Sequence, residues 1–273
     1  MSSSTPEQVQ ASTPGGDGGP AGPGSGGGAP RRGGLPRLLV LVTALTVLLA
    51  AAVAIPSYLL LKRNHTALAA QQSRVSGIPA SVSTSLANLM VLSPVPGIRA
   101  PGFTLTDQDG HTLSLSSLHG KVVVLQFMDP HCTDICPIVS AEFVKAYRDL
   151  GPLASKVVFA AVNVNTYHAR VQDMARYTQA QQLGTIPSWH FFTGPVPALK
   201  SVWRGYNIQV YAPNANADVQ HTSAVYFIDA QGRERFLASP EVDHTKSGAS
   251  YLPASQQIAW GHGIALVARQ LAR

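Results

Sequence analysis

Two short apolar runs constrain the fold of this chain more than any other feature. KVVVLQF (residues 121–127) and KVVFAAVNV (156–164) are rich in β-branched residues and have the length of buried strands. Each run precedes a segment with apolar residues at helical spacing, first over 137–151 and then over 168–184. Strands that alternate with helices predict an α/β domain whose central sheet is covered by helices.

Further elements are predicted on both sides of this core. FTLTDQDGHTLSL (103–115) alternates apolar and polar residues around an Asp-Gly pair, which predicts a β-hairpin. Gly151 is expected to end the first helix. We also expect a strand at 188–194, a strand and turn at 223–236 and an amphipathic helix at 261–273. Residues 98–273 are therefore assigned to one domain.

A long apolar run predicts a membrane anchor. Residues 38–61 contain no charge in 24 positions, and about 20 apolar residues suffice to span a bilayer as a helix. Three arginines precede the run, and Lys62 and Arg63 follow it, so the charge balance favours a cytoplasmic N-terminus. We expect a single-pass protein of the bacterial cell membrane with an extracytoplasmic C-terminal domain. The alternative is cleavage after a signal-peptidase-like site at 52–54, which would release the domain.

The segments on either side of the run have low complexity. Residues 1–37 contain a Gly/Pro tract with little to bury and are expected to be a disordered cytoplasmic tail. Residues 62–97, rich in Ser, Ala and Gln, are expected to be a stalk or linker. Within them LANLMVL (86–92) can pack on the domain or on the membrane surface, and the sequence leaves this open.

The net charge of +6 does not indicate a nucleic-acid partner. Up to residue 98 the chain has six basic and two acidic residues, and the remainder has fourteen and twelve. The excess charge therefore lies mostly around the apolar run, and the domain is close to neutral. Without a clustered basic stripe, we expect no nucleic acid to bind.

The only two cysteines of the chain, Cys132 and Cys136, lie between a predicted strand and helix, directly before Pro137. A helix N-terminus lowers the pKa of a thiol, although Asp129 and Asp134 would oppose this effect. A structural disulfide, a redox dithiol and a metal site all remain open. A loop this short adds little stability as a disulfide, and structural zinc normally takes four protein ligands. Two thiolates suit Cu(I).

Three motifs carry a resemblance to a known family. CTDICP (132–137), SWHFFTG (188–194) and VQHTSAVYFIDAQGR (219–233) together resemble the Sco/SenC family of copper chaperones. Residues 100–127 are also similar to the opening of thioredoxin-like redoxins. The resemblance covers roughly residues 98–270 and the anchor. It implies a thioredoxin-like fold, with a central mixed sheet flanked by helices and an N-terminal transmembrane helix.

The resemblance also implies a function and a set of ligands. It implies copper, Cu(I) or Cu(II), on Cys132, Cys136 and His221, and delivery of that copper to the CuA centre of cytochrome c oxidase subunit II. The alternative is an enzyme, a thiol-disulfide oxidoreductase that keeps the copper-binding cysteines of the oxidase reduced. We expect a chaperone rather than a turnover enzyme. If strands 121–127 and 224–228 are antiparallel, as in thioredoxin-like folds, Cys132 and His221 lie at the same edge of the sheet.

Two stretches depart from the family pattern. Asp-Pro-His (129–131) precedes the first cysteine in place of the commoner aromatic-Thr pattern. VNVNTYHARVQDM (162–174) replaces an acid-rich stretch that contains Asp-Pro. Both departures bear on the partner surface and on the tuning of the site. His131 is a further candidate ligand because it adjoins Cys132, whereas His65, His111, His119, His168, His190, His244 and His262 have no motif support.

Overall fold

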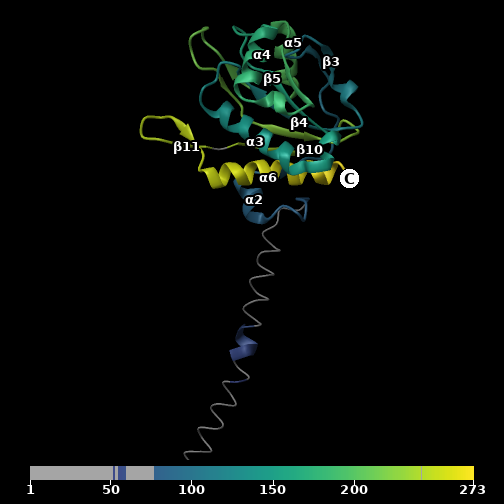
Figure 1. The fold of residues 1–273 in the computed structure, drawn as a ribbon, viewed down its shortest axis with the longest axis vertical. Helices are drawn as coiled ribbons and strands as arrows, with labels where there is room; N and C mark the ends of the chain where they lie inside the picture. Colours follow the sequence, from purple (N-terminus) through teal and green to yellow (C-terminus); the bar gives the residue numbers. More distant parts are fainter. Residues whose placement is uncertain (1–51, 53–54, 60–76, 241) are drawn as a thin grey trace, which may run out of the picture. The chain divides into compact units, whose positions relative to one another are not determined.

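The computed structural model describes Ala52 and residues 55–59, 77–240 and 242–273. The chain divides into two units, Met1–Arg63 and Asn64–Arg273, and the folded domain belongs to the second. Figure 1 shows the fold of that domain. The predicted tail lies outside the described residues, as does most of the predicted anchor, of which residues 55–59 are helical and exposed. None of the helices in the described ranges has the length and apolar character needed to cross a bilayer.

A six-stranded mixed sheet forms the centre of the domain, in the order β1-β10-β9-β4-β5-β6. Strands β4, β5 and β6 are parallel, and β9 is antiparallel to β4. Strand β10 is antiparallel to β9, and β1 to β10. The strands span Ser93–Pro94 (β1), Val122–Met128 (β4), Val157–Asn163 (β5), Trp189–Phe192 (β6), Val225–Ile228 (β9) and Glu234–Ala238 (β10).

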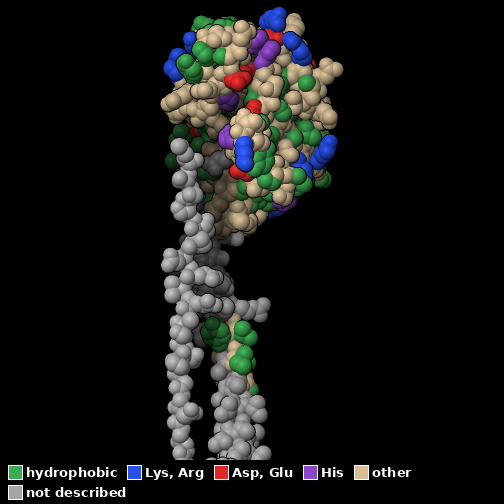
Figure 2. All heavy atoms as spheres, turned by 90° about the vertical axis from the view of Figure 1, so that its left-hand side faces the viewer, with side chains coloured by type: hydrophobic (Ala, Val, Ile, Leu, Met, Phe, Trp, Pro, Cys, Tyr) green, Lys and Arg blue, Asp and Glu red, His purple; other side chains and the backbone are tan. Residues whose placement is uncertain are grey.

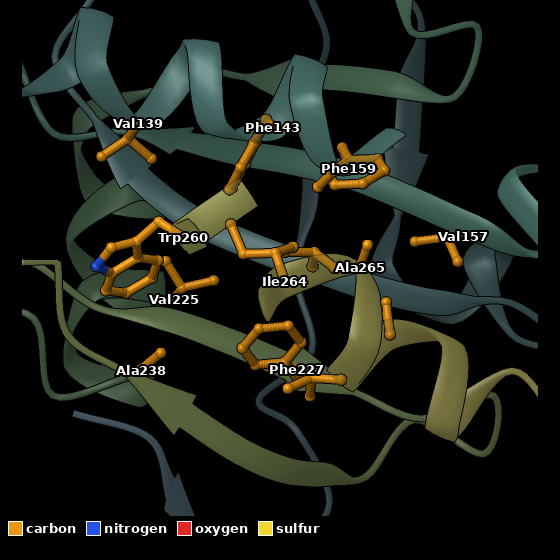
Figure 3. Packing of buried hydrophobic residues seen from close by; sticks show 14 of the residues in the cluster. Val139, Phe143, Val157, Phe159, Val225, Phe227, Ala238, Trp260, Ile264 and Ala265 are labelled. Carbon is orange, nitrogen blue, oxygen red and sulfur yellow. The ribbon is translucent and has the colours of Figure 1, made fainter. Parts of the chain in front are cut away.

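The two central strands are buried on both faces, as their apolar runs predict. Side chains alternate across a strand, so Val122 and Val124 enter one hydrophobic core and Val123 and Leu125 enter the other. Helices α3 (Ile135–Leu150), α4 (Val171–Ala180) and α6 (Ala254–Leu271) contribute to the first core. Figure 3 shows Phe143 of α3 and Ile264 of α6 meeting over the sheet.

The second face is covered by helix α5 (Val196–Gly205) and a hairpin formed by β2 (Thr104–Thr106) and β3 (Thr112–Ser114). The hairpin confirms the prediction from the Asp-Gly pair, whose Gly110 has a φ of +84° that favours glycine. Two further hairpins and three 3-10 turns complete the domain. They are β7 (Val210–Tyr211) with β8 (Gln220–His221), β11 (Asp243–His244) with β12 (Ser250–Tyr251), and η1 (Leu115–Leu118), η2 (Gly151–Lys156) and η3 (Leu183–Thr185).

This arrangement is a thioredoxin-like fold, with helices on both faces of a mixed sheet, and confirms the predicted fold class of the domain. Three details differ from the sequence prediction. Helix α3 begins at Ile135 rather than 137, which places Pro137 third in the helix, where its missing N–H has no intrahelical partner to lose. Helix α6 begins at Ala254, seven residues before the predicted 261. Helix α5 was not predicted.

The apolar segment LANLMVL packs on the domain. It overlaps helix α2 (Thr84–Leu89), which contacts α6, and the Met90 side chain is fully buried in the first core. A Cβ atom at Gly263 of α6 would collide with the Sδ atom of Met90, so the close approach of these segments requires glycine. With β1 paired to β10, the folded domain extends upstream of residue 98 into the segment expected to be a linker.

The surface of the domain has mixed character. On the face drawn in Figure 2, Lys and Arg side chains are scattered among neutral and apolar ones, and His side chains lie close to acidic ones. Side chains of both signs of charge are therefore present on this face.

Candidate functional site

Cys132 and Cys136 lie together where β4 gives way to α3, and both are free thiols. Cys132 is half-buried in the loop, and Cys136 is buried in the first turn of the helix. The backbone N–H of Cys136 donates a hydrogen bond of 3.3 Å to the Sγ atom of Cys132. Asp134, at the N-cap position, makes no side-chain capping bond, so the sulfur of Cys132 takes the place of a capping oxygen.

The pKa values of the two thiols move in opposite directions. A hydrogen bond from the Cys136 thiol lowers the pKa of Cys132 to about 7, and backbone N–H groups of Cys136 and Asp134 add to the effect against the opposing cost of burial. The same hydrogen bond, burial and the charge on Cys132 raise the pKa of Cys136 well above its ordinary value. Near pH 7 the thiolate form of Cys132 is therefore substantially populated, while Cys136 remains a thiol.

The two nearby aspartates act differently from one another. The Asp134 carboxylate accepts hydrogen bonds from the backbone N–H and the Oγ of Ser250, at 2.8 and 2.7 Å, while its own N–H lowers the pKa of Cys132. The backbone of Asp134 therefore favours the thiolate, an effect that the sequence prediction did not include. The Asp129 carboxylate raises the pKa of Cys132 slightly, as predicted.

His221, the third predicted ligand, lies half-buried at the end of β8. Its Nδ1 atom lies 3.0 Å from the carbonyl oxygen of Thr222. A carbonyl only accepts, so Nδ1 carries the proton and Nε2 keeps a lone pair. Burial lowers the pKa of His221, which favours this neutral form at physiological pH.

The fold places the three predicted residues at one edge of the sheet. Strands β4 and β9 are antiparallel, with Gln126 paired to Val225, so the end of β4 that leads to Cys132 meets the start of β9, which His221 precedes. This confirms the predicted strand direction. The Asp129 carboxylate raises the pKa of both thiols and of His221, so all three lie within the electrostatic reach of this carboxylate.

The three residues do not yet form a coordination sphere. In the described ranges, clusters with three ligand atoms all within 4.8 Å of one another are His131–His168–Asp173 and Asp107–Asp109–His111. The two cysteines and His221 are not such a cluster. The thiol pair is therefore preformed, and His221 must move closer to bind the same ion.

His131 and His168 form a contact that sequence reasoning did not find. Their imidazole rings stack with centroids 3.5 Å apart and planes 20° apart. Burial and the charge of His168 lower the pKa of His131. The sequence offered one signal for this contact, because His131 and His168 lie in the two stretches that depart from the family pattern. A hollow beside Cys132 is lined by residues that include His131, Asp173, Arg176 and Tyr177.

The other histidines of the domain mostly have structural partners. His190 Nδ1 lies 3.1 Å from Asp107 Oδ2, and His262 Nδ1 lies 3.1 Å from Asp149 Oδ2. His190 and His262 therefore have structural partners, which is consistent with the absence of a metal-binding motif around them.

Comparison with known proteins identifies relatives of the domain. A family model described as SCO1/SenC matches residues 96–249, a region that contains both cysteines and His221. A protein of Bacillus subtilis (strain 168) named "SCO1 protein homolog" is 26% identical over 137 residues, which cover 48% of this chain and 68% of that protein. A "Peroxiredoxin Q, chloroplastic" of Populus jackii is 36% identical over 95 residues, which cover 32% of this chain and 45% of that protein.

A solved structure agrees with the fold. The SCO1/SenC family lipoprotein from Bacillus anthracis str. Ames superposes with a TM-score of 0.52 at 22% identity. The match covers 66% of this chain and 98% of that one. At this level of identity the similarity establishes the shared fold.

Proposed function

The chain belongs to the SCO1/SenC family, and from this premise we propose that it is a membrane-anchored copper-binding chaperone. It would deliver copper to the CuA site of cytochrome c oxidase subunit II during assembly of the oxidase. The family membership of the chain and the function that its sequence motifs imply both support this role. It applies to the folded domain of residues 77–273 together with the anchor expected over 38–61.

The observation that carries the proposal is the Cys132–Cys136 pair at the start of α3. A metal-binding sulfur must be deprotonated, and Cys132, with a pKa of about 7, supplies a thiolate at neutral pH. Cys136 gives up its proton when a cation replaces the hydrogen bond between the sulfurs. Two soft sulfur donors in one turn of chain fit Cu(I).

His221 would supply a third donor. Its Nε2 lone pair is available because the proton is on Nδ1, and it lies at the same edge of the sheet as the thiols. Nitrogen donors suit Cu(II) as well as Cu(I), so a Cys₂His set can hold both oxidation states. A ligand that joins and leaves with a movement of the β7–β8 hairpin allows copper to be exchanged with an acceptor site.

A second function is favoured by the asymmetry of the two thiols. Half-buried Cys132 is the more acidic, and buried Cys136 stands beside it as a resolving thiol. The Cys132 thiolate would attack a disulfide of the oxidase and release one of its sulfurs as a thiolate. Cys136 would then attack Cys132 and release the second, leaving the pair as a disulfide that an external dithiol reduces again. Asp129 occupies the place of the threonine in a peroxiredoxin-type Thr-x-x-Cys motif, which disfavours a peroxidase.

One experiment separates the two functions. The full chain, purified in detergent with reduced thiols and loaded with Cu(I), is mixed with a copper-free CuA domain, and copper is measured in each protein after separation. A chaperone transfers copper to the reduced CuA domain. A reductase instead converts the disulfide form of that domain to free thiols without copper. His221→Ala is the matched variant because it alters the proposed copper site and keeps both thiols.

We also propose a cellular location for the domain, from the charge and hydrophobicity of the N-terminal sequence. The uncharged run of residues 38–61 supports an anchor in the bacterial cell membrane, and the arginines before it support an extracytoplasmic domain. That location would place the thiols on the same side as an extracytoplasmic CuA domain.

A further inference from the structure

The stacked pair of His131 and His168 is a feature that the proposed function does not use. The two residues come from different loops, one after β4 and the other after β5, and their rings lie 3.5 Å apart. Each ring offers a nitrogen within 4.8 Å of the other and of the Asp173 carboxylate. Two nitrogens that bind one ion at about 2.0 Å can lie up to about 4 Å apart. Their lone pairs lie in the ring planes, so binding of one ion by both requires at least one ring to turn out of the stack.

A network of buried polar groups holds the two loops together. The Asp129 Oδ1 atom accepts hydrogen bonds from the backbone N–H of His131, at 2.8 Å, and from Asn165 Nδ2, at 2.9 Å. Asn165 Oδ1 in turn accepts from the backbone N–H groups of Tyr167 and His168, at 3.0 and 3.3 Å. Asp129 and Asn165 are both buried. The histidines are therefore positioned by the fold and do not meet as two free surface side chains.

Both imidazoles have a nitrogen available for a metal. His168 Nε2 lies 3.4 Å from the carbonyl oxygen of Ala215, so this nitrogen carries the proton and Nδ1 keeps the lone pair. Within the described part of the chain, the ring of His131 has no hydrogen-bond partner, and it is exposed to solvent. A cation can approach these two nitrogens from solvent without breaking a hydrogen bond, although the two rings must turn out of their stacked arrangement to bind it together.

The charged groups around the pair are balanced. Asp129 and Asp173 are negative, and Arg170 and Arg176 are positive. The Asp173 carboxylate already accepts four hydrogen bonds from the two arginines, which occupy its acceptor positions. It can become a ligand only by releasing an arginine. The two imidazoles are therefore the primary donors, with water completing the coordination.

We propose that His131 and His168 form a second metal site, which binds a divalent transition-metal ion and prefers Cu(II) to Zn(II). Imidazole is a borderline donor that suits both ions, and Cu(II) is the more strongly bound of the two at nitrogen sites. The site differs from the thiol site in its donors and in the oxidation state that it favours. An ion held there lies next to Cys132, so on the proposed function Cu(II) would be held here and pass, without a change of oxidation state, to the Cys132, Cys136 and His221 ligands.

The test removes the thiol site first. Cys132→Ser, Cys136→Ser and His221→Ala are combined in the full chain in detergent, and the protein is titrated with Cu(II) alone, then with Zn(II) alone. We expect one Cu(II) per chain, with two nitrogen donors visible in its electron paramagnetic resonance spectrum. Because this background lacks the proposed copper ligands, the result is independent of whether the chaperone proposal holds.

Histidine variants in this background assign the site. His131→Ala or His168→Ala should weaken Cu(II) binding roughly tenfold or more, since loss of even a supporting group typically costs that much. His262→Ala, an exposed histidine on α6, should leave binding unchanged. Circular dichroism checks folding, and His131→Gln and His168→Gln replace any alanine variant that unfolds. Unchanged Cu(II) affinity in both the His131 and the His168 variants would overturn the proposal. A loss of the same size in the His262 variant would overturn it too.

Discussion

The Sγ atom of Cys132 accepts a hydrogen bond of 3.3 Å from the backbone N–H of Cys136. At the start of a helix such an N–H is usually capped by an oxygen of Ser, Thr, Asp or Asn. A sulfur in this position lies in the positive field of the helix N-terminus, which favours its thiolate form. The hydrogen bond from the Cys136 thiol, reinforced by backbone N–H groups at the start of the helix, therefore makes one of two neighbouring cysteines acidic.

We predict that Cys132 of the metal-free, reduced protein reacts with iodoacetamide with a midpoint near pH 7. Only the thiolate reacts, and the pKa of Cys132 is lowered to about 7 by the hydrogen bond from the Cys136 thiol. Peptide mapping by mass spectrometry gives the rate at each pH. Cys136→Ala removes the donor thiol and should move the midpoint to higher pH. A midpoint close to 9 in the parent chain would show that neither the Cys136 thiol nor the backbone N–H groups stabilise the thiolate.

A second prediction concerns Glu142, a buried residue of α3. Burial raises its pKa to about 8, and its Oε2 atom has no hydrogen-bond partner among the described residues. The unfolded chain loses this proton near pH 4.5, whereas the folded chain keeps it until about pH 8. The contribution of Glu142 to stability is therefore fully present below pH 4.5 and falls as the pH rises to 8.

Glu142→Gln, whose side chain cannot ionise, should remove this loss of stability at high pH. We expect the variant to match the parent near pH 4.5 and to be more stable by roughly 4 kcal/mol at pH 8. Denaturant unfolding at a series of pH values measures the difference. Asp243→Asn is the control, because it removes a carboxylate at an exposed position of β11. A constant difference between Glu142→Gln and the parent across this range would refute the account.

We predict a distinct effect of His221→Ala on the two oxidation states of copper. Loss of the imidazole should weaken Cu(II) binding severely and remove the thiolate-to-copper absorption band, because Cu(II) favours nitrogen donors. Cu(I) binding should weaken less, since both sulfurs remain. Titration at matched pH with reduced thiols measures both. Unchanged Cu(II) affinity would show that His221 is an ordinary histidine at the edge of the core.

The proposed membrane location leads to a further prediction. The uncharged run of residues 38–61 should keep the chain in the membrane fraction, with the domain outside the cytoplasm. Protease added to intact spheroplasts should then digest the domain, as detected by an antibody against it. A cytoplasmic marker protein must stay intact in the same sample. Protection of the domain would reverse the proposed orientation, and its release into the soluble fraction would exclude an uncleaved anchor.

Local patterns in the sequence predict the centre of the fold well. Strands β4 and β5 appear as β-branched apolar runs because they are buried on both faces. Gly151 ends α3 with a φ of +57°, a conformation that glycine adopts at low cost. The spacing of the two cysteines is local too, so their meeting at a helix N-terminus was predictable.

Features that depend on partners distant in sequence were not predictable in the same way. Helix α5 buries Leu199, Val202 and Trp203 against the second face of the sheet, a contact that exists only after the sheet forms. His131 and His168 stack because a buried Asp129–Asn165 contact joins their loops. No spacing rule links these histidines.

The central claim is tested most directly by an anaerobic Cu(I) titration of the full, reduced chain against a chromophoric competitor. The account predicts one tightly bound Cu(I) per chain. It also predicts that Cys136→Ser loses this binding, because a hydroxyl cannot replace a soft thiolate, while His262→Ala retains it. No tight Cu(I) binding by the parent chain, or near-parental affinity in Cys136→Ser, would contradict the account.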